Sequence, residues 1–458
     1  MAFINRLQEL KFLKDNTQKN GLIIIYGRRR IGKTKLLKQL KPKKNYKKIY
    51  YLAKEQPIKK TLDELNNKFI KEFNELSLLD NPINSIEKLF KFLQNKKTIF
   101  ILDEFPLLLK ESNILGHMQE FLDSKPNCSL ILCGSYISAM EKIKDYSSPI
   151  YGRRMSSLKV RELNFTHLKK FFSKINKEDL VKIYGVLGGI PEYLLKYSNN
   201  DFKSFIKNNL FKKDTYLYEE AEFLLRYELR DLSSYNSILK AIASGYSTLN
   251  EIAQKSYIAK NAIIKYFDTL SGLDLIHNEQ PYLSGKKDKL KERNSLYFIK
   301  DNYFNFYYNF IYPFKEEINL GHISEVVDYF NKNFNAYLEF IFENISKQFL
   351  IDKFKINFAR QWGNYKTKEN NKLINKSYEI DLLNVNQEKK EIIVFEVKWK
   401  DLDYKKSLKI IKELENKINY LPINLEKYKI KIGIVAKSVK YKQKLTKQGF
   451  LVFDLVNM

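Results

Sequence analysis

Three short apolar runs in the first third of the chain are separated by segments with helical periodicity. The runs are GLIIIY at 21–26, TIFIL at 98–102 and SLILC at 129–133. Short continuous apolar runs of this kind are typical of strands buried on both faces of a parallel sheet. Because helical patterns such as LDELNNKFIKEFNEL lie between them, we predict a doubly wound α/β domain whose site lies at the carboxyl ends of the strands.

The pattern changes beyond residue 161. It is helical through about residue 230, and 235–276 then reads as three short amphipathic helices. Two strand-like segments separated by a polar turn follow, which favours a winged helix. The last 120 or so residues begin with a helix at 337–350 and then alternate apolar strands with helical segments. This order predicts a second α/β unit at the end of the chain.

The loop after the first apolar run carries candidate chemistry. It matches GxxxxGK[ST] between a strand and a helix, the context of a phosphate-binding loop. The residues predicted to contact a nucleotide are Gly27, Arg28, Arg29, Arg30, Ile31, Gly32, Lys33, Thr34 and Lys35. Loop amides and the helix N-terminus would face the phosphates, Lys33 would reach the β and γ oxygens, and Thr34 would ligate magnesium. The sequence therefore predicts ATP and Mg²⁺ as cofactors.

The ends of the next two apolar runs add polar groups to the same sheet edge. Asp103 and Glu104 follow the second run, and Ser135 follows the third. We expect Asp103 to hold magnesium, Glu104 to polarise the attacking water, and Ser135 to contact the γ-phosphate or that water. The alternatives are acids at the start of a surface loop for the first two residues and a polar strand cap for Ser135.

Charge and composition change the picture in one respect. The 458 residues carry 81 basic and 53 acidic side chains, a net charge of +28, which favours a polyanionic partner such as DNA. Only 11 of the basic residues are arginine, and five of these fall in two clusters, 28–30 and 153–154. We predict that Arg153 or Arg154 senses the γ-phosphate, in the same chain or in a neighbouring subunit; the alternative is a solvated basic turn.

A second constellation lies near the end of the chain. Glu396 and Lys398 stand two apart on one apolar strand, so both lie on one face, and Asp381 begins the strand before it. Pairing of these strands would bring the three residues together, with Glu343 available from the preceding helix. Such carboxylates can hold one or two magnesium ions while a lysine activates water. The alternative is a solvent-facing alternation on an edge strand.

Taken with these residues, the chain resembles an archaeal-type ATPase of the AAA+/STAND-related group with a C-terminal domain of unknown function similar to PD-(D/E)xK nucleases. The resemblance spans essentially the whole length and rests on FINRLQELKFL, GRRRIGKT, FILDEFPLLL, LILCGSYISAM, SPIYGRRMSSLKV, GGIPEYL, EIDLL and FEVKWK. It implies a P-loop fold, ATP and magnesium, with Lys33, Thr34, Asp103 and Glu104 in the family's roles. It further implies that Gly189 and Pro191 contact the adenine side of the nucleotide.

These inferences combine into one predicted organisation. The fold class is α/β, with a P-loop core at 1–165, a helical lid at 166–230, a winged helix at 231–314, a linker at 315–335 and a nuclease-like domain at 336–458. We expect a cytoplasmic ATPase that acts as a nucleotide-dependent switch or motor on DNA, as a homo-oligomer or with a protein partner, and without a membrane segment. The alternative is a STAND-type scaffold that binds ATP and protein partners without DNA.

Overall fold

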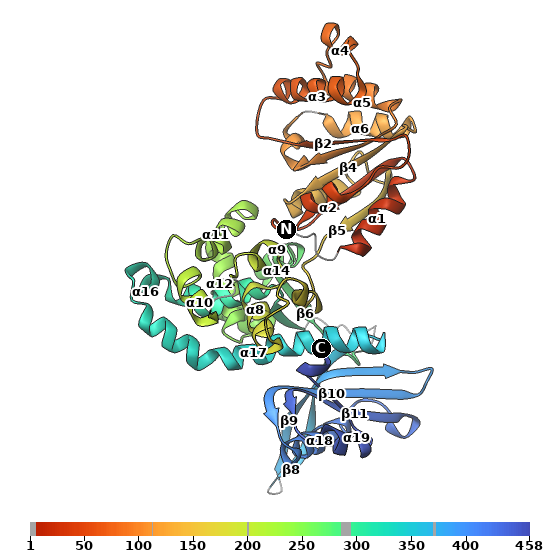
Figure 1. Cartoon of the computed structure of the whole chain (residues 1–458). Coiled ribbons are helices and arrows are strands. Elements are labelled where there is room, and N and C mark those ends of the chain that lie inside the picture. Colours follow the sequence, from red (N-terminus) through yellow and green to blue (C-terminus); the bar gives the residue numbers. More distant parts are fainter. Residues whose placement is uncertain (1–5, 112, 199–200, 285–294, 370–371) are drawn as a thin grey trace. The chain divides into compact units, whose positions relative to one another are not determined.

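The computed structural model describes residues 6–111, 113–198, 201–284, 295–369 and 372–458. The chain divides into two compact units, which Figure 1 shows coloured along the sequence. The first comprises Met1–Glu162 with Ile190–Glu192, and the second comprises Leu163–Gly189 with Tyr193–Met458. In the part of the chain described, no helix is long and apolar enough to cross a membrane.

The first unit is built on a parallel sheet of five strands in the order β2-β3-β4-β1-β5. Its strands are β1 (Gly21–Tyr26), β2 (Lys47–Leu52), β3 (Thr98–Asp103), β4 (Cys128–Gly134) and β5 (Arg154–Lys159). Its helices are α1 (Leu7–Thr17), α2 (Lys33–Gln39), α3 (Ile58–Phe73), α4 (Ser77–Asp80), α5 (Ile86–Gln94), α6 (Ile114–Asp123) and α7 (Ile137–Lys144). The three strands predicted from apolar runs form the centre of the sheet, where β3 and β4 are buried at every position. The predicted α/β fold is therefore confirmed.

The second unit begins with helices. These are α8 (Lys177–Leu187), α9 (Pro191–Leu194), which begins in the first unit, α10 (Phe202–Asn209) and α11 (Tyr216–Glu228). Three more helices follow, α12 (Leu232–Ala243), α13 (Leu249–Ser256) and α14 (Lys260–Gly272), and then an antiparallel pair, β6 (Ile276–Glu279) and β7 (Leu296–Ile299). Three helices followed by a two-stranded hairpin is the element order expected for 231–314. The polar turn predicted between the strands falls mainly on 285–294, outside the described residues.

The segment predicted as a linker, 315–335, is helical instead. It contains α16 (Lys315–Leu320) and the first part of α17, a 32-residue helix over Ile323–Phe354. Phe330 and Phe334 stand one helical turn apart and are buried against Phe306 and Phe310, which follow the start of α15 (Asn302–Phe306). This aromatic contact holds the segment as a helix although most of its other side chains are polar.

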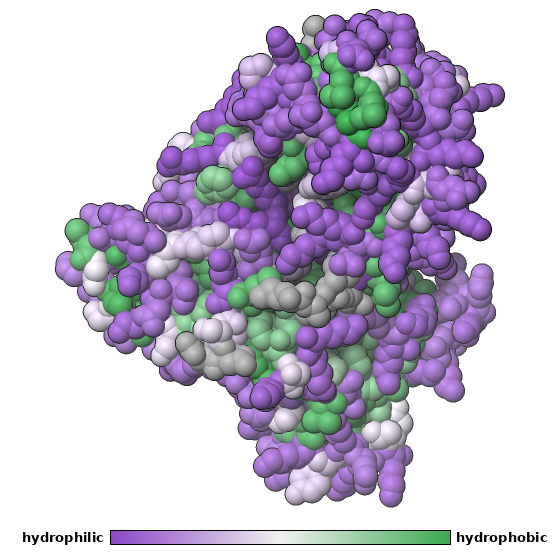
Figure 2. Space-filling view, turned by 45° about the horizontal axis from the view of Figure 1, so that its top comes forward, coloured by the Kyte–Doolittle hydropathy of each residue, from purple (hydrophilic) through white to green (hydrophobic). Residues whose placement is uncertain are grey.

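The second unit ends in a mixed sheet with the order β12-β11-β10-β9-β8. Its elements are β8 (Ala359–Glu369), β9 (Lys372–Asn386), β10 (Glu391–Leu402), α18 (Tyr404–Ile418), β11 (Lys429–Val439), α19 (Lys442–Lys447) and β12 (Leu451–Asp454). β8, β9 and β10 are antiparallel neighbours, whereas β10, β11 and β12 run parallel. The predicted C-terminal α/β unit is present. Hydrophilic residues dominate the molecular face shown in Figure 2, and hydrophobic residues appear there in small patches.

Candidate functional site

The loop between β1 and α2 has a backbone that demands glycine at two points. Gly27 has a φ of +148°, and a Cβ there would lie 2.4 Å from the carbonyl oxygen of Val160. Gly32 has a φ of +94° and immediately precedes α2, while Arg30 between them also has a positive φ, +68°. The first glycine lets the chain beyond β5 approach closely, and the second provides the left-handed turn into the helix. The loop thus delivers Lys33 and Thr34 to the first turn of α2.

Lys33 turns back onto its own loop. Its Nζ donates to the carbonyl oxygens of Gly27, at 2.7 Å, and Arg28, at 2.9 Å. Burial lowers the pKa of Lys33, while the nearby carboxylates of Glu104 and Asp103 oppose that shift. A buried ammonium is stabilised by an anion, so phosphate oxygens suit this position better than the neutral carbonyls do.

Thr34 and Asp103 meet at the carboxyl end of the sheet. Thr34 Oγ1 donates to Asp103 Oδ2 at 2.7 Å, and the Tyr50 hydroxyl from β2 donates to the same oxygen at 2.7 Å. Burial, and then the hydrogen bond to Asp103, raise the pKa of Tyr50. A hydroxyl and a carboxylate side by side are oxygen ligands that fit Mg²⁺. The sequence analysis missed Tyr50 because it did not predict β2.

Glu104 and Ser135 also lie together. The Ser135 hydroxyl is 2.7 Å from one Glu104 carboxylate oxygen and 2.8 Å from the other, and the Ser135 amide donates to the same group at 3.4 Å. Glu104 adopts a left-handed conformation with φ +53°. For a non-glycine residue this costs about 1–2 kcal/mol, and such strain clusters at functional sites. The geometry joins two residues that were predicted separately from the ends of two strands.

A further contact supports the loop from outside. The Arg6 guanidinium, which is 6% exposed, donates to the carbonyl oxygen of Ile31 at 3.0 Å and pairs with Glu9. The sequence analysis did not single out Arg6, although an arginine in so arginine-poor a chain was a usable signal. Arg6 therefore anchors the loop at the carbonyl of Ile31, two residues before Lys33 begins α2.

Arg153 and Arg154 lie at the amino-terminal ends of the strands, opposite the end that carries the phosphate loop. Arg153 forms two hydrogen bonds, at 2.7 and 3.0 Å, to Asp123 at the end of α6. Arg154 pairs with Leu22 at the beginning of β1, whereas the phosphate loop follows the end of that strand. Leu22 and the last residue of β1, Tyr26, are four residues apart, which at about 3.3 Å per residue places Arg154 about 13 Å along the strand from the start of the phosphate loop. In this structure the two arginines thus lie at the end of the sheet opposite the phosphate loop; γ-phosphate sensing by Arg153 or Arg154, within the chain or toward a neighbouring subunit, stays a prediction.

The GGIPEYL element has a structural reason for one of its glycines. A Cβ on Gly189 would lie 1.9 Å from the carbonyl oxygen of Leu163, whose amide donates to Gly189 at 2.9 Å. Pro191 is the first residue of α9, a position where its missing amide hydrogen is not needed. The adenine contact of these two residues stays a prediction.

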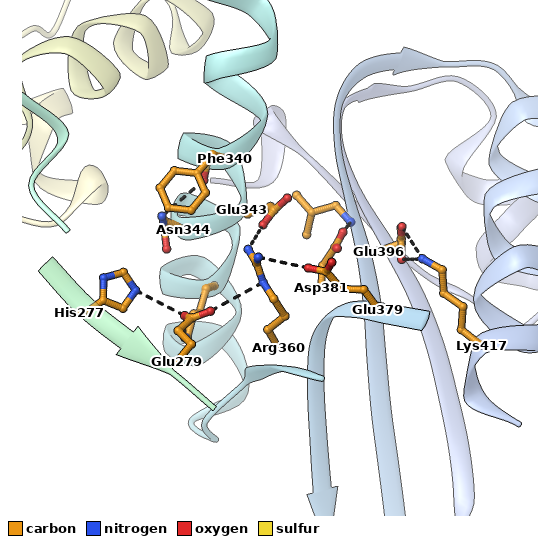
Figure 3. Close-up of polar contacts among 12 residues, drawn as sticks. His277, Glu279, Phe340, Glu343, Asn344, Arg360, Glu379, Asp381, Glu396 and Lys417 are labelled. Atoms are coloured by element: carbon orange, nitrogen blue, oxygen red, sulfur yellow. Dashed lines mark hydrogen bonds and ion pairs between the residues drawn. The ribbon is translucent and has the colours of Figure 1, made fainter. Parts of the chain in front are cut away.

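The C-terminal sheet brings together three of the predicted residues. Asp381 lies on β9, and Glu396 and Lys398 lie on the neighbouring β10. Lys398 Nζ is 2.9 Å from Glu396 Oε1 and 3.6 Å from Asp381 Oδ2, and the amide of Val397 donates to Asp381 at 2.7 Å. Lys417 from α18 adds a second cation, 2.9 Å from both Glu396 oxygens (Figure 3). We refer to Asp381, Glu396, Lys398 and Lys417 as the carboxylate–lysine cluster.

Glu343 lies close to the cluster but faces another partner. It pairs with Arg360 from β8, which also reaches Glu379 at 3.1 Å and Glu279 of β6 at 3.7 Å (Figure 3). Among the described residues, no group of three or more histidine, cysteine or acidic side chains is arranged to hold a metal ion. The structure thus pairs the carboxylates of Asp381 and Glu396 but does not bring Glu343 into one three-carboxylate site with them.

Burial and neighbouring charges perturb these groups strongly. Burial, with the Glu396 charge as the next cause, raises the pKa of Asp381 to about 6. Burial, with the Asp381 charge as the next cause, raises the pKa of Glu343 to about 8. Burial alone would lower the pKa of Lys398, but the charges of Asp381 and Glu396 raise it above its ordinary value. Perturbed groups of this kind gather at functional sites, although structural ion pairs also produce them.

Comparison with known proteins places the chain in a family. Residues 3–197 match an ATPase domain found predominantly in Archaea, and 307–410 match a family described as archaeal and bacterial proteins of unknown function. The uncharacterized protein MJECL04 of Methanocaldococcus jannaschii is 35% identical over 465 residues, with 99% of each chain covered. The chain belongs to this archaeal-type ATPase family.

Two solved structures resemble this ATPase. The Walker-type ATPase PABY2304 of Pyrococcus abyssi superposes with a TM-score of 0.51 at 23% identity, covering 67% of this chain and 96% of that one. The ORC2 protein of Aeropyrum pernix gives a TM-score of 0.42 at 13% identity, covering 70% and 94%. The first likeness supports the fold. The protein is a P-loop ATPase of archaeal type, and its loop, acidic pair and serine occupy the sheet edge where that fold binds nucleotide.

Proposed function

We propose that this ATPase is a nucleotide-dependent switch or motor that acts on DNA, and that the carboxylate–lysine cluster is a metal-dependent site for the phosphodiester backbone. The observation that carries this proposal is the convergence of Asp381, Glu396 and Lys398 from two neighbouring strands. Two carboxylates with an adjacent lysine suit a divalent cation and the negative charge of a phosphodiester under attack.

In the ATPase site we assign each role to a residue. Lys33 binds the β- and γ-phosphates, Thr34 and Asp103 hold Mg²⁺, and Glu104, hydrogen-bonded to Ser135, orients the attacking water. Magnesium would neutralise charge on the phosphates when it is bound. Support comes from the Thr34–Asp103 hydrogen bond of 2.7 Å and from the burial of Lys33, which favours an anionic ligand.

The three helices and hairpin at 231–314 form a winged helix that contacts DNA in this proposal. Lys260, Asn261 and Lys265 of α14 are exposed, and Tyr257 at the turn before α14 is 96% exposed. Exposed lysines on the second helix of a helix-turn-helix, with an exposed aromatic side chain in the turn before it, suit a phosphate-lined groove. The predicted domain division is part of the proposal, except that 315–335 forms helices.

The C-terminal sheet supports a nuclease-like domain by its element order as well as by its cluster. Within the cluster the Glu396 carboxylate already has two cationic partners, since Lys398 and Lys417 both contact it. A divalent metal ion bound by Asp381 and Glu396 would therefore compete with Lys417. Lys398 would remain beside the pair to activate water or offset charge at phosphorus.

The action on DNA is tested by the ATPase rate with and without double-stranded DNA, together with a gel shift at two salt concentrations. We expect stimulation of hydrolysis and an affinity that falls steeply with salt, because lysine–phosphate contacts release counterions. Lys33→Ala should abolish hydrolysis while keeping the salt-dependent shift. An ATPase rate indifferent to DNA, together with no shift at low salt, would refute the proposal and favour a scaffold that binds protein partners.

Cleavage is tested separately with supercoiled plasmid in Mg²⁺ or Mn²⁺. We expect nicking by the wild-type chain and none by Asp381→Ala or Lys398→Ala. Glu388→Ala and Lys389→Ala are matched controls, because both residues lie exposed in the turn between β9 and β10 and should leave nicking unchanged. Intact plasmid with both metals would refute cleavage, and together with a salt-dependent gel shift it would mean that the protein binds DNA without cutting it.

A further inference from the structure

The second unit contains a cleft of about 760 Å³ beside the carboxylate–lysine cluster. Its walls come from β8 and β9, from the C-terminal part of α18 and the Tyr420 that follows it, from Pro281 after β6, and from Leu296, the first residue of β7. Tyr282 and Leu283, which follow β6, are hydrogen-bonded to this sheet. The amide of Leu283 donates to Gln361 at 2.9 Å, and the Tyr282 hydroxyl accepts from the Val385 amide at 3.2 Å. Clefts of this size accept a nucleotide-sized ligand.

Aromatic side chains line one part of the cleft. The rings of Tyr365 and Tyr420 stack with centroids 3.7 Å apart and planes 14° from parallel. Tyr420 is 39% exposed, and the half-buried Trp362 lines the same cleft. A stacked, partly exposed platform of this kind presents π-faces to a flat ligand.

Polar groups complete the lining. The side-chain amides of Asn364 and Asn416 can each donate and accept hydrogen bonds, whereas the carboxylate of Glu413 only accepts them. Aromatic faces combined with a few amides and an acceptor are the groups that bind a nucleobase by its face and its edges.

The cleft is continuous with the cluster through shared residues. Lys417 lines the cleft and contacts both carboxylate oxygens of Glu396 at 2.9 Å. Glu379 lines it as well and pairs with Arg360, which holds Glu343 (Figure 3). A ligand in the cleft would therefore be separated from the Glu396 carboxylate only by the side chain of Lys417.

We propose that this cleft binds an unstacked nucleobase of a DNA strand, and that it places the neighbouring phosphate at Asp381 and Glu396. The inference rests on the proposed function and narrows its substrate to single-stranded or locally opened DNA. A base inside a duplex has both faces covered by its neighbours, so it reaches an aromatic platform only after it leaves the stack. Glu413 meets the exocyclic amino group of cytosine better than the carbonyl oxygen at the same position of thymine.

The chain itself supplies a reporter for this inference. It has two tryptophans, Trp362 in the cleft and Trp399, which is 7% exposed and packed on Phe342. Titration of the full-length protein, without divalent metal, with an eight-nucleotide oligo-dC should quench tryptophan fluorescence and saturate. Trp362→Phe should remove most of the quenching, because the remaining tryptophan lies outside the cleft.

Variants distinguish stacking from nonspecific attraction. Tyr420→Ala should weaken oligo-dC binding about tenfold or more, as expected for the loss of base stacking, and Tyr420→Phe should restore it. Tyr441→Ala is the control, since Tyr441 is 67% exposed outside the cleft and should bind like wild type. Glu413→Gln, which removes no apolar contact, should reduce the preference for oligo-dC over oligo-dT.

The outcomes separate this inference from the proposed function. Salt-dependent binding of duplex DNA with no quenching by oligo-dC would overturn the base site and leave the action on DNA standing. Equal binding by wild type, Tyr420→Ala and Glu413→Gln would overturn it too. Absence of binding to any DNA would refute the proposed function itself. If Tyr420→Ala does not fold, the Glu413→Gln comparison still decides the matter.

Discussion

Replacing Glu279 by glutamine should destabilise the second unit at neutral pH and do so less at acidic pH. Glu279 is 19% exposed on β6 and lies 3.6 Å from His277, 3.6 Å from Lys347 and 3.7 Å from Arg360. Burial would raise its pKa, but His277, Lys347 and Arg360 together lower the pKa to about 2 from 4.5. That difference corresponds to about 3 kcal/mol of unfolding free energy, shared among all three partners, as an upper limit.

The sign of the pH dependence follows from the direction of the shift. Because the pKa of Glu279 is lower in the folded state, the unfolded chain binds more protons as the pH falls below about 4.5. The stabilisation is complete above that pH and is lost as the pH falls through about 2. Glu279→Gln should therefore cost up to about 3 kcal/mol at pH 7 and about 2 kcal/mol at pH 3.5.

Urea unfolding followed by tryptophan fluorescence measures this difference, because both tryptophans lie in the second unit. Glu388→Gln is the matched control, an exposed glutamate in a turn that should change the unfolding free energy little at either pH. The electrostatic account of this contact would be refuted if Glu279→Gln lowered the unfolding free energy no more than Glu388→Gln does. It would also be refuted if the decrease in unfolding free energy became larger as the pH falls.

Three further predictions concern the first unit. Lys33→Ala should lose ATP binding in a filter or fluorescence assay, whereas Glu104→Gln should bind ATP normally and lose turnover; wild-type hydrolysis by the latter would remove Glu104 from its assigned role. Gly27→Ala should lower the melting temperature and weaken nucleotide binding, because its Cβ would meet a backbone oxygen at 2.4 Å; unchanged affinity would show that the loop adapts. Arg153→Ala and Arg154→Ala, tested separately, should leave ATP binding by dilute protein unchanged and reduce turnover only where subunits associate; a loss that is independent of protein concentration would contradict a role between subunits.

The sequence predicted those parts of the fold that depend on local pattern. β1, β3 and β4 are buried on both faces, so their apolar runs were visible, and the phosphate loop is contiguous in the sequence. β2 and β5 were missed because both contain exposed positions and neither has a long apolar run: β2 begins with two lysines, and β5 contains Arg154, Ser156 and Ser157. The grouping of Thr34 with Asp103 followed from topology, since parallel strands end at one sheet edge.

The parts that were missed depend on contacts between distant residues. Lys417 reaches Glu396 from a helix, and Arg360 joins carboxylates from β6, α17 and β9. No local spacing marks such partners in a chain with 81 basic residues. The start of α17 was misjudged for a related reason, because the helical spacing of Phe330 and Phe334 became informative only with the aromatic partners that bury them.

In each candidate site a lysine of the protein already contacts other groups of that site, and this affects the affinity for a ligand. Lys33 donates to loop carbonyls, and Lys417 contacts both oxygens of Glu396. A ligand at either site gains its own contacts minus those that the lysine gives up, so its net affinity is lower than its contacts alone suggest. In the ATPase site Lys33 would exchange neutral carbonyls for anionic phosphates, which would favour binding. In the proposed metal site Asp381 and Glu396 would hold the cation, and Lys417, released from Glu396, would be available to a DNA phosphate at the cleft that it lines. Metal and DNA would then strengthen each other's binding by the same factor, since coupling between two ligands is reciprocal.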